Sequence, residues 1–393
     1  MRGRIFLLSS AFILLVLTTS ANAYRPVIDL GDGTAYSIND NGLIVGQSGG
    51  HACLFDSTGH GANKDLGAFG GTQSVAYCIN NSGKIVGQAS GGDSVNYACL
   101  FDASGGGANE NLSPVSGPVL PGQSYGSASS INNNFYIVGA GSYKVSFPGG
   151  FTVEFPHAFF FNPSIPWSDK DLGTLGGSDS YAYSINNNNK IVGWAQIPSP
   201  FPGTYPGHSR ACIFGTPLGQ NNLDLGAIGG YTSIAYSIND SDVIVGRADY
   251  YQGNVSLYHA CLFDSSGGGA NIDLGSLPGY EYSEARFVNN LGQIVGGVSG
   301  WSQFPPVPPH PIYSACLFDA SGQGNNTDLN LLIDPDLASV WTLEKAYCIN
   351  NSGWIVGSMA NNTTGDTHAF LLTPEPASLL LFALGGLILR RKK

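Results

Sequence analysis

The sequence predicts an all-β protein, a β-propeller built from seven four-stranded repeats. Three observations support this prediction: one unit recurs seven times, each unit holds four short strand-like runs, and residues 24–373 lack helical periodicity. The units are spaced by 41 to 61 residues, which is too variable for the fixed coils of a β-helix, whereas propeller loops absorb insertions. Six or eight blades, a sandwich or a solenoid are the alternatives.

The repeated unit reads D-L-G, then A-Y-x-I-N, then I-V-G, then H-A-x-L-F. Its anchors, the residues that precede the asparagine, are Ile38, Ile79, Ile131, Ile185, Ile238, Val288 and Ile349. The segments between the second and third runs, such as "DNG", "NSG", "NNNNK" and "DSD", hold the residue types of tight hairpin turns. Their oxygen-rich side chains leave calcium binding as an alternative, although the full spaced ligand set is missing. No other cofactor is expected.

The order of the runs predicts how the ring closes. The last unit ends in "HAFLLT" at residues 368–373 with no D-L-G after it, while the first D-L-G, at residues 29–31, precedes the first unit. The N-terminal strand therefore completes the seventh blade, which removes the exposed sheet edges that invite aggregation.

Residues 1–23 have the features of a secretory signal peptide. Arg2 and Arg4 precede an apolar run, and Ala21 and Ala23 supply the small residues of a cleavage site. We expect cleavage after Ala23 and export through the inner membrane. An uncleaved anchor is the alternative, but the apolar stretch is short for a span of about 20 residues.

Residues 374–393 form a three-part tail. Thirteen apolar or small residues separate a Pro-Glu-Pro triplet from a basic cluster. The triplet is Pro374, Glu375 and Pro376, and the cluster is Arg390, Arg391 and the two lysines that follow. Thirteen residues are too few for a permanent span, so we expect a short transmembrane helix that contacts the membrane transiently, with its positive charge held inside.

This tail resembles the PEP-CTERM sorting signal of Gram-negative bacteria. The resemblance implies that an exosortase recognises Pro374, Glu375 and Pro376 and processes the protein. It also implies a place at the cell surface or in the extracellular matrix, since carriers of the signal are associated with exopolysaccharide and biofilm.

Charge excludes one class of partner. The 393 residues carry a net charge of −11. Without the two terminal segments, 10 basic and 26 acidic residues remain, a net charge of −16. Such a chain cannot neutralise a phosphate backbone, so nucleic acid is not expected to bind.

The cysteines and histidines occupy fixed positions of the repeat. Five of the seven cysteines stand at the x of H-A-x-L-F, where Phe159 and Phe370 stand in other units, and Cys78 and Cys348 replace a serine. We therefore expect mostly free, buried thiols. Four histidines share the first position of the same run with a tyrosine, an arginine and a serine, so we expect hydrogen-bonded strand-end residues; a metal site is the alternative.

The whole unit, as in "DLGTLGGSDSYAYSIN" followed by "KIVGWA" and "HAFFF", resembles the HAF repeat of bacterial extracellular proteins. The resemblance covers nearly all of residues 26–373. Five units depart from it by carrying Cys in place of the Phe of the H-A-F triplet, and unit three has "ENLSPVSGPVLPGQ" in place of its D-L-G segment. The family supplies no catalytic residues.

The segments that connect I-V-G to H-A in units three to six are the candidate binding surface. They are long, rich in aromatic residues and proline, and nearly free of charge, and they occupy one position in the unit and hence one face of the disc. Flat aromatic rings suit sugars or partner loops. The predicted binding face comprises Tyr143, Phe147, Phe151, Phe155, Tyr205, Tyr250, Tyr251, Trp301 and Phe304. Packing of these rings onto the disc itself is the alternative.

These features predict an exported, non-enzymatic surface or matrix protein that binds carbohydrate or protein partners. A carbohydrate-active enzyme, either a glycosidase or a lyase, is the alternative, and a scaffold for other proteins is a third possibility. A hydrolase needs two carboxylates a few ångströms apart. The acids available near the face are Glu154, Asp249, Glu281 and Glu284, and their spacing assigns no catalytic pair.

Overall fold

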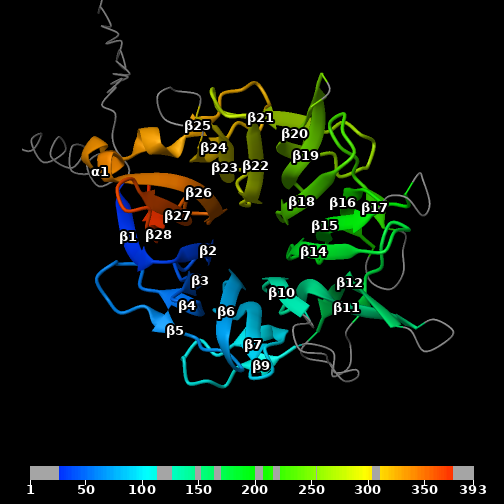
Figure 1. Ribbon diagram of the computed structural model, residues 1–393, viewed down its shortest axis with the longest axis horizontal. Coiled ribbons are helices and arrows are strands. Elements are labelled where there is room, and N and C mark those ends of the chain that lie inside the picture. The colour runs from blue at the N-terminus through cyan, green and yellow to red at the C-terminus, as the bar shows by residue number, and fades with distance from the viewer. Residues whose placement is uncertain are drawn as a thin grey trace, which may run out of the picture.

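The computed structural model of the chain describes residues 26–112, 126–146, 152–162, 170–199, 207–215, 222–253, 255–302 and 310–374. These residues form seven four-stranded antiparallel sheets, arranged as blades around a central axis (Figure 1). The prediction of a seven-bladed β-propeller is confirmed, and the alternative architectures are excluded.

Each blade runs from an inner strand at the axis to an outer strand at the rim. Blades 1 to 3 are formed by β2 (Thr34–Ile38), β3 (Ile44–Ser48), β4 (His51–Phe55) and β5 (Lys64–Asp65); by β6 (Gly70–Ile79), β7 (Ile85–Gly91), β8 (Asn96–Phe101) and β9 (Glu110–Asn111); and by β10 (Gly126–Ile131), β11 (Ile137–Ser146), β12 (Thr152–Phe161) and β13 (Lys170–Asp171). Blades 4 and 5 are formed by β14 (Ser180–Ile185), β15 (Ile191–Gln196), β16 (Ser209–Phe214) and β17 (Leu223–Asp224), and by β18 (Ser233–Ile238), β19 (Ile244–Gln252), β20 (Val255–Phe263) and β21 (Ile272–Gly275). Blades 6 and 7 are formed by β22 (Tyr282–Val288), β23 (Ile294–Trp301), β24 (Pro311–Phe318) and β25 (Thr327–Asp328), and by β26 (Trp341–Ile349), β27 (Ile355–Asn361), β28 (Thr367–Leu372) and β1 (Val27–Asp32).

Blade 7 takes its outer strand from the other end of the chain. Strand β1 pairs antiparallel with β28, with Val27 opposite Leu372, and the Thr373 amide donates a hydrogen bond of 3.1 Å to the carbonyl oxygen of Pro26. Figure 1 shows this junction where the blue strand meets the red one. The predicted closure by the N-terminal strand is confirmed.

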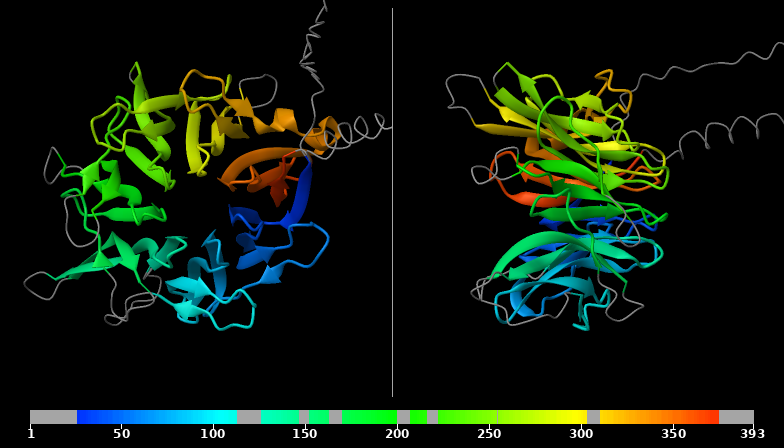
Figure 2. Two further views of the ribbon diagram at one scale, coloured as in Figure 1. Left: turned by 180° about the vertical axis from the view of Figure 1, so that it is seen from behind. Right: turned by 90° about the vertical axis from the view of Figure 1, so that its right-hand side faces the viewer.

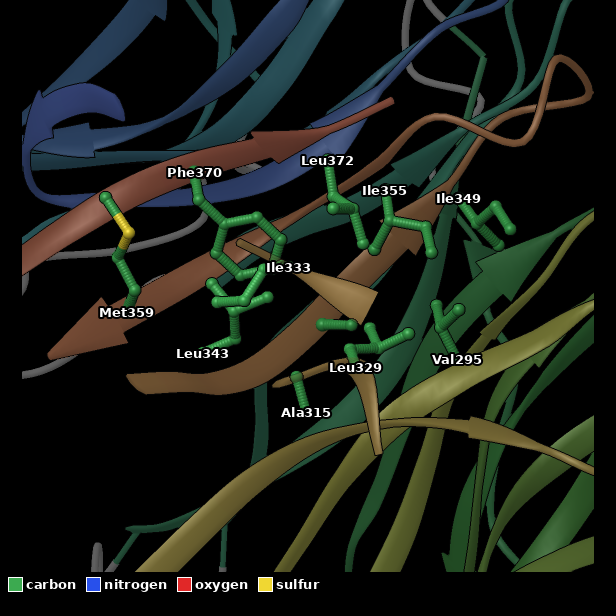
Figure 3. Packing of buried hydrophobic residues seen from close by; sticks show 11 residues of the cluster. Val295, Ala315, Leu329, Ile333, Leu343, Ile349, Ile355, Met359, Phe370 and Leu372 are labelled. Atoms are coloured by element: carbon green, nitrogen blue, oxygen red, sulfur yellow. The ribbon is translucent and has the colours of Figure 1, made fainter. Parts of the chain in front are cut away.

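Apolar layers between neighbouring sheets hold the blades together. In the layer between blades 6 and 7, Val295 and Ala315 of one sheet pack against Ile349 and Ile355 of the next, and all four are buried (Figure 3). Equivalent positions of the repeat fill the other layers, so the I-N and I-V-G runs of the sequence supply the core of the whole ring.

One connection contains helix, which the absence of helical periodicity did not predict. A 3-10 turn, η1 (Leu329–Leu332), and a short α-helix, α1 (Pro335–Val340), join blade 6 to blade 7. Asp334 caps the α-helix by accepting a hydrogen bond from the Asp336 amide, and Pro335 at the first helical position is already set to a helical φ. Six residues are too few to show a 3.6-residue period, so capping residues were the only available signal.

The two faces of the disc differ in what they carry, and we name them accordingly. Each inner strand ends in the tight turn that leads to the second strand, so these seven turns lie on one face, the turn face. The second strand returns to the opposite face, where it connects to the third strand; this is the insert face, because the long connections of units three to six emerge there. The edge-on view in Figure 2 shows the two faces.

Candidate functional site

A β-bulge at the same position of every inner strand shapes the central channel. In blade 1, Ala35 pairs with Gly46 and Ser37 pairs with Val45, so Tyr36 has no partner in the ladder. The register skips the corresponding residue in all seven blades, namely Tyr36, Tyr77, Ser129, Tyr183, Tyr236, Arg286 and Tyr347. Because a bulge redirects the side chain of the extra residue, these seven residues line the channel.

The glycine of I-V-G makes the bulge possible. A Cβ atom placed on Gly46 would lie 1.9 Å from the carbonyl oxygen of Thr34, and on Gly246 it would lie 1.9 Å from that of Ile234. The same overlap, of 1.8 or 1.9 Å, occurs at the equivalent glycine of every blade. The A-Y and I-V-G runs therefore belong together, since the second allows the first to bulge.

The bulged residues form a ring of aromatic side chains, which we call the tyrosine layer. Edge-to-face or tilted contacts join its five tyrosines into two groups. In the first, the ring centroid of Tyr36 is 5.0 Å from that of Tyr347 and 6.0 Å from that of Tyr77; in the second, those of Tyr183 and Tyr236 are 5.4 Å apart. These are the separations that aromatic pairs favour.

Blade 3 interrupts the layer with Ser129, and a neighbouring tyrosine occupies the space. Tyr181, two residues before the bulge of blade 4, has its ring centroid 4.7 Å from that of Tyr183. Its hydroxyl hydrogen-bonds to the hydroxyls of Ser127 and Ser129. Tyr181 thus places an aromatic ring beside the layer at the blade where the repeat departs from its pattern.

Blade 6 interrupts the layer with a charge. The guanidinium of Arg286 lies 4.4 Å from the ring centroid of Tyr236 and 6.0 Å from that of Tyr347. It donates a hydrogen bond of 2.8 Å to Glu284, which also accepts one of 2.6 Å from Lys345 of blade 7. Two cations therefore share one carboxylate at this edge of the channel.

The carboxylate of Glu284 and the two cations stabilise each other's charged forms. Glu284 is only 7% exposed, and burial alone would raise its pKa, but the charges of Arg286 and Lys345 hold the pKa below its ordinary value. Glu284 raises the pKa of Arg286 in turn, against the effect of burial. The cluster thus carries one negative and two positive charges at neutral pH.

The tyrosines keep their protons. Burial raises the pKa of Tyr183 and of Tyr347 to about 12, and it raises that of Tyr36, Tyr77 and Tyr236 as well. At neutral pH the layer therefore offers neutral hydroxyls, which can both donate and accept hydrogen bonds. The cavity that the layer lines, together with Phe287 and the serines and cysteine of the next layer, has a volume of about 150 Å³.

The turn-face mouth of the channel is built from the asparagines of the I-N run. The side-chain amide of each asparagine donates a hydrogen bond of 2.9 to 3.1 Å to the main-chain carbonyl of the equivalent asparagine in the next blade. The circle of seven bonds passes through Asn39, Asn80, Asn132, Asn186, Asn239, Asn289 and Asn350, and it closes on itself. The same side chains accept two hydrogen bonds from their own turns, so each asparagine fixes one turn and joins two blades.

A second circle is formed by the residues that follow. Each main-chain amide donates to the side-chain oxygen of its counterpart in the next blade, at 2.8 to 3.0 Å, through Asp40, Asn81, Asn133, Asn187, Asp240, Asn290 and Asn351. The interpretation of these segments as repeated turns is confirmed. Both carboxylate oxygens of Asp40 and of Asp240 accept hydrogen bonds within this circle.

The insert face carries the described members of the predicted binding face. Trp301, at the end of β23, is 50% exposed, and Tyr251, in β19, is 46% exposed. Tyr250 is half-buried against His259, with ring centroids 4.3 Å apart, and Phe155 in β12 is half-buried. The residues lie on blades 3, 5 and 6, so the structure distributes them along one face and does not gather them into one cluster.

Several of these residues lie in strands that extend beyond the disc, and not in irregular loops. Strands β19 and β20 continue their pairing from Asp249 opposite Tyr258 out to Gln252 opposite Val255, and β11 pairs Tyr143 with Phe155 of β12. Aromatic residues favour strands, which explains why these connections extend the hairpin. Phe147, Phe151, Tyr205 and Phe304 lie outside the described residues, as do Ala21, Ala23, Glu375, Pro376, Arg390 and Arg391.

An aromatic cluster on this face was missed from the sequence. Tyr231, 55% exposed, stacks on His208 with ring centroids 4.9 Å apart and planes 15° apart, and its centroid is 5.9 Å from that of Tyr251. The three residues come from the second-to-third-strand connection of blade 4, the turn into blade 5 and strand β19. Tyr231 lies in the segment "GAIGGYTS" and was not among the residues of the predicted binding face.

The repeated histidines hold the outer strands. His51 Nδ1 lies 2.9 Å from the carboxylate of Asp65, and His368 Nδ1 lies 2.9 Å from that of Asp29. His157 and His259 pair in the same way with the D-L-G aspartates of their blades. The hydrogen bond from His51 keeps the pKa of Asp65 below its ordinary value. The prediction of hydrogen-bonded strand-end histidines is confirmed.

The cysteines are packing residues. All seven lie within the described part of the chain, and all are free thiols. Burial raises the pKa of Cys53 and of Cys348 to about 12, which makes the thiolate scarce at neutral pH. Among the described residues, no group of three or more histidine, cysteine, aspartate or glutamate side chains is placed to hold a metal ion.

Seven bulged four-stranded sheets around a polar channel define the chain as a seven-bladed β-propeller with distinct faces. Residues 372–393 match the PEP-CTERM protein-sorting motif, so the predicted sorting tail is found. The motif implies processing by an exosortase, export and sorting to the cell surface. Searches of curated proteins and of solved structures found no match. In the described residues, neither short helix has the length or the apolar character needed to cross a membrane.

Proposed function

We propose that this protein is an exported, non-enzymatic component of the bacterial cell surface or matrix that binds carbohydrate through its insert face. Residues 1–23 serve as the signal peptide, residues 24–373 are the mature HAF-repeat propeller, and residues 374–393 are the sorting tail. Exopolysaccharide of the producing bacterium is the proposed ligand, and protein partners of the same face are the second choice.

The exposed aromatic residues of the insert face carry this proposal. Tyr231, Tyr251 and Trp301 are each about half exposed although rings of this size gain most from burial. Tyr231 is held by His208 on one side and Tyr251 on the other, so its ring is oriented before any ligand arrives. A fixed, exposed ring is suited to stacking on the apolar face of a sugar, since little entropy is lost on binding.

The test mixes the purified full-length protein with exopolysaccharide from the producing bacterium and follows two readouts, co-sedimentation and the release of new reducing ends. We expect binding without cleavage. Tyr231→Ala and Trp301→Ala should each weaken co-sedimentation about tenfold, whereas replacement of the exposed Leu291 on the turn face should not. Binding that survives both aromatic substitutions would contradict the proposed surface.

A carbohydrate-active enzyme is the alternative, and one observation favours it. Burial raises the pKa of Asp249, which lies beside the aromatic cluster, although the charge of Arg247 opposes this shift. A general acid needs a raised pKa. Steady release of reducing ends that Asp249→Asn abolishes would establish the enzyme and overturn the non-enzymatic proposal.

A further inference from the structure

The insert-face mouth of the channel holds two cationic side chains in a strongly acidic protein. Residues 24–373 hold only 10 basic residues, and two of them, Arg286 and Lys345, meet at this mouth. Glu284 forms ion pairs with both, and Glu344 also lies within reach of the charge of Lys345. Of these three side chains, Arg286 lines the cavity itself, and its side chain is 28% exposed.

Arg286 is only partly engaged by its partner. One terminal nitrogen donates to Glu284, while the buried Nε atom has no hydrogen-bond partner. Two tyrosine rings flank the guanidinium, and Glu284 is the one carboxylate among the described residues to which it bonds. A guanidinium in this position is prepared to pair with an additional oxyanion.

The rest of the cavity is suited to a ring that carries hydroxyl groups. Five protonated tyrosines and the hydroxyls of Ser37, Ser129, Ser130 and Ser184 line it, so donors and acceptors surround the space. Its volume of about 150 Å³ is that of a cavity known to take one small ring. The tyrosine rings and Phe287 add flat apolar surface.

From the charge of Arg286, the hydroxyl lining and the size of the cavity, we infer that the tyrosine layer binds a single sugar residue that carries a carboxylate. The carboxylate pairs with Arg286, and the sugar hydroxyls bond to the tyrosine and serine hydroxyls. This inference rests on the proposed carbohydrate-binding function and names the ligand class: acidic saccharides whose terminal uronate-type residue enters the channel mouth.

Calorimetric titration of the full-length protein with D-glucuronate, D-glucose and inorganic phosphate tests the inference. We expect glucuronate to bind at least about tenfold more tightly than glucose, because the charged hydrogen bond to Arg286 is added. Phosphate should bind no more tightly than glucose. Equal affinities for glucuronate and glucose, or tighter binding of phosphate, would overturn the proposal.

Substitutions locate the site. Arg286→Gln should reduce glucuronate affinity about tenfold or more and leave glucose affinity unchanged. The matched control is Arg247→Gln, because Arg247 also lies over a tyrosine, 4.5 Å from the ring centroid of Tyr258, but does not line the cavity. Unchanged glucuronate affinity in Arg286→Gln would refute the assignment of the carboxylate to this residue.

A second variant covers the case in which Arg286→Gln fails to fold because Glu284 loses a partner. Tyr236→Phe keeps the ring and removes one hydroxyl of the layer, and it should weaken glucuronate and glucose equally, about threefold. No change in either affinity would contradict the role of the layer.

The two proposals fail in different ways. Loss of exopolysaccharide co-sedimentation in Tyr231→Ala with glucuronate affinity intact would leave the channel site in place. Loss of glucuronate binding in Arg286→Gln with co-sedimentation intact would refute the channel site alone.

Discussion

The two mouths of the channel are made from adjacent residues of the same repeat, yet they differ in regularity. At the turn face, the asparagine and the residue after it make the same hydrogen bonds in all seven blades. At the insert face, the bulged position holds tyrosine in five blades and departs from it twice, at Ser129 and Arg286. The comparison teaches that uniform positions of the repeat build the frame, while the departures make the ring asymmetric.

The largest loss of stability is expected at the I-V-G glycines, because the absence of a Cβ atom there allows the bulge that presents the tyrosine layer. Gly246→Ala would place a Cβ atom 1.9 Å from the carbonyl oxygen of Ile234, so the bulge that presents Tyr236 has to open. We expect a loss of about 4 kcal/mol or more in the free energy of unfolding, measured in urea. Gly92→Ala is the control, since its nearest neighbour is 3.9 Å away. A loss of unfolding free energy in Gly246→Ala as small as that in Gly92→Ala would show that the bulge can shift to accommodate the Cβ atom.

A large effect is also expected at the turn face. Asn239→Leu removes the acceptor of the Ser241 and Val243 amides and the donor to the Asn289 carbonyl, so three hydrogen bonds of a buried side chain are lost. Loss of about 3 kcal/mol in unfolding free energy is expected. Ser241→Ala, an exposed change in the same turn, should cost less than about 0.5 kcal/mol. Similar losses in both variants would argue against the asparagine circle as a source of stability.

The charged cluster should make stability depend on pH. The folded-state pKa of Glu284 lies below its ordinary value of 4.5, so its ionised form stabilises the fold above that pH, and the contribution is lost as the pH falls through the folded pKa. Glu284→Gln should lower the unfolding free energy by about 2 kcal/mol at neutral pH, and the difference from the natural protein should shrink in acid. The exposed Glu110→Gln should show no such difference. A gap that is constant with pH would contradict the assignment.

The smallest effect concerns the layer between the two mouths, where Cys78 and Cys348 replace serine. Burial raises the pKa of both thiols. Treatment of the folded protein with iodoacetamide at neutral pH should therefore leave its mass unchanged, while in denaturant all seven cysteines should react. Rapid labelling of Cys78 or Cys348 in the folded protein would show that these thiols form thiolate more readily than the raised pKa implies.

The sequence predicted the architecture because the repeat reports it directly. Seven units, four runs in each and the displaced first D-L-G were sufficient for blade number and closure. The turns "DNG" and "NSG" were also recognisable, since their residue types are local signals. Their bonds to the next blade were not predictable, because the partners lie 41 to 61 residues away, or 311 residues away at the closing pair, and nothing in one turn specifies them.

The tyrosine layer could not be predicted for a different reason. In a regular strand, Tyr36 would share a side with Thr34 and Ile38, and nothing in that alternation indicates a channel residue. The bulge breaks the two-residue period at this position, and its only signal is a glycine in the next strand. Alignment of the units would still have shown that Ser129 and Arg286 are exceptions. The exposed Tyr251 and Trp301 were expected because loop composition is visible in sequence, whereas the stacking of Tyr231 on His208 depends on the meeting of two blades.

The pairing of β1 with β28 has a consequence for biogenesis. The first strand to leave the membrane has its partner at the far end of the propeller, so it stays unpaired until the last blade has followed it. Leu372, the residue opposite Val27, is also the first residue of the matched sorting motif. The strand that completes the ring therefore ends where the sorting motif begins. A chain released early would expose two open strands to proteases and to other unfinished chains.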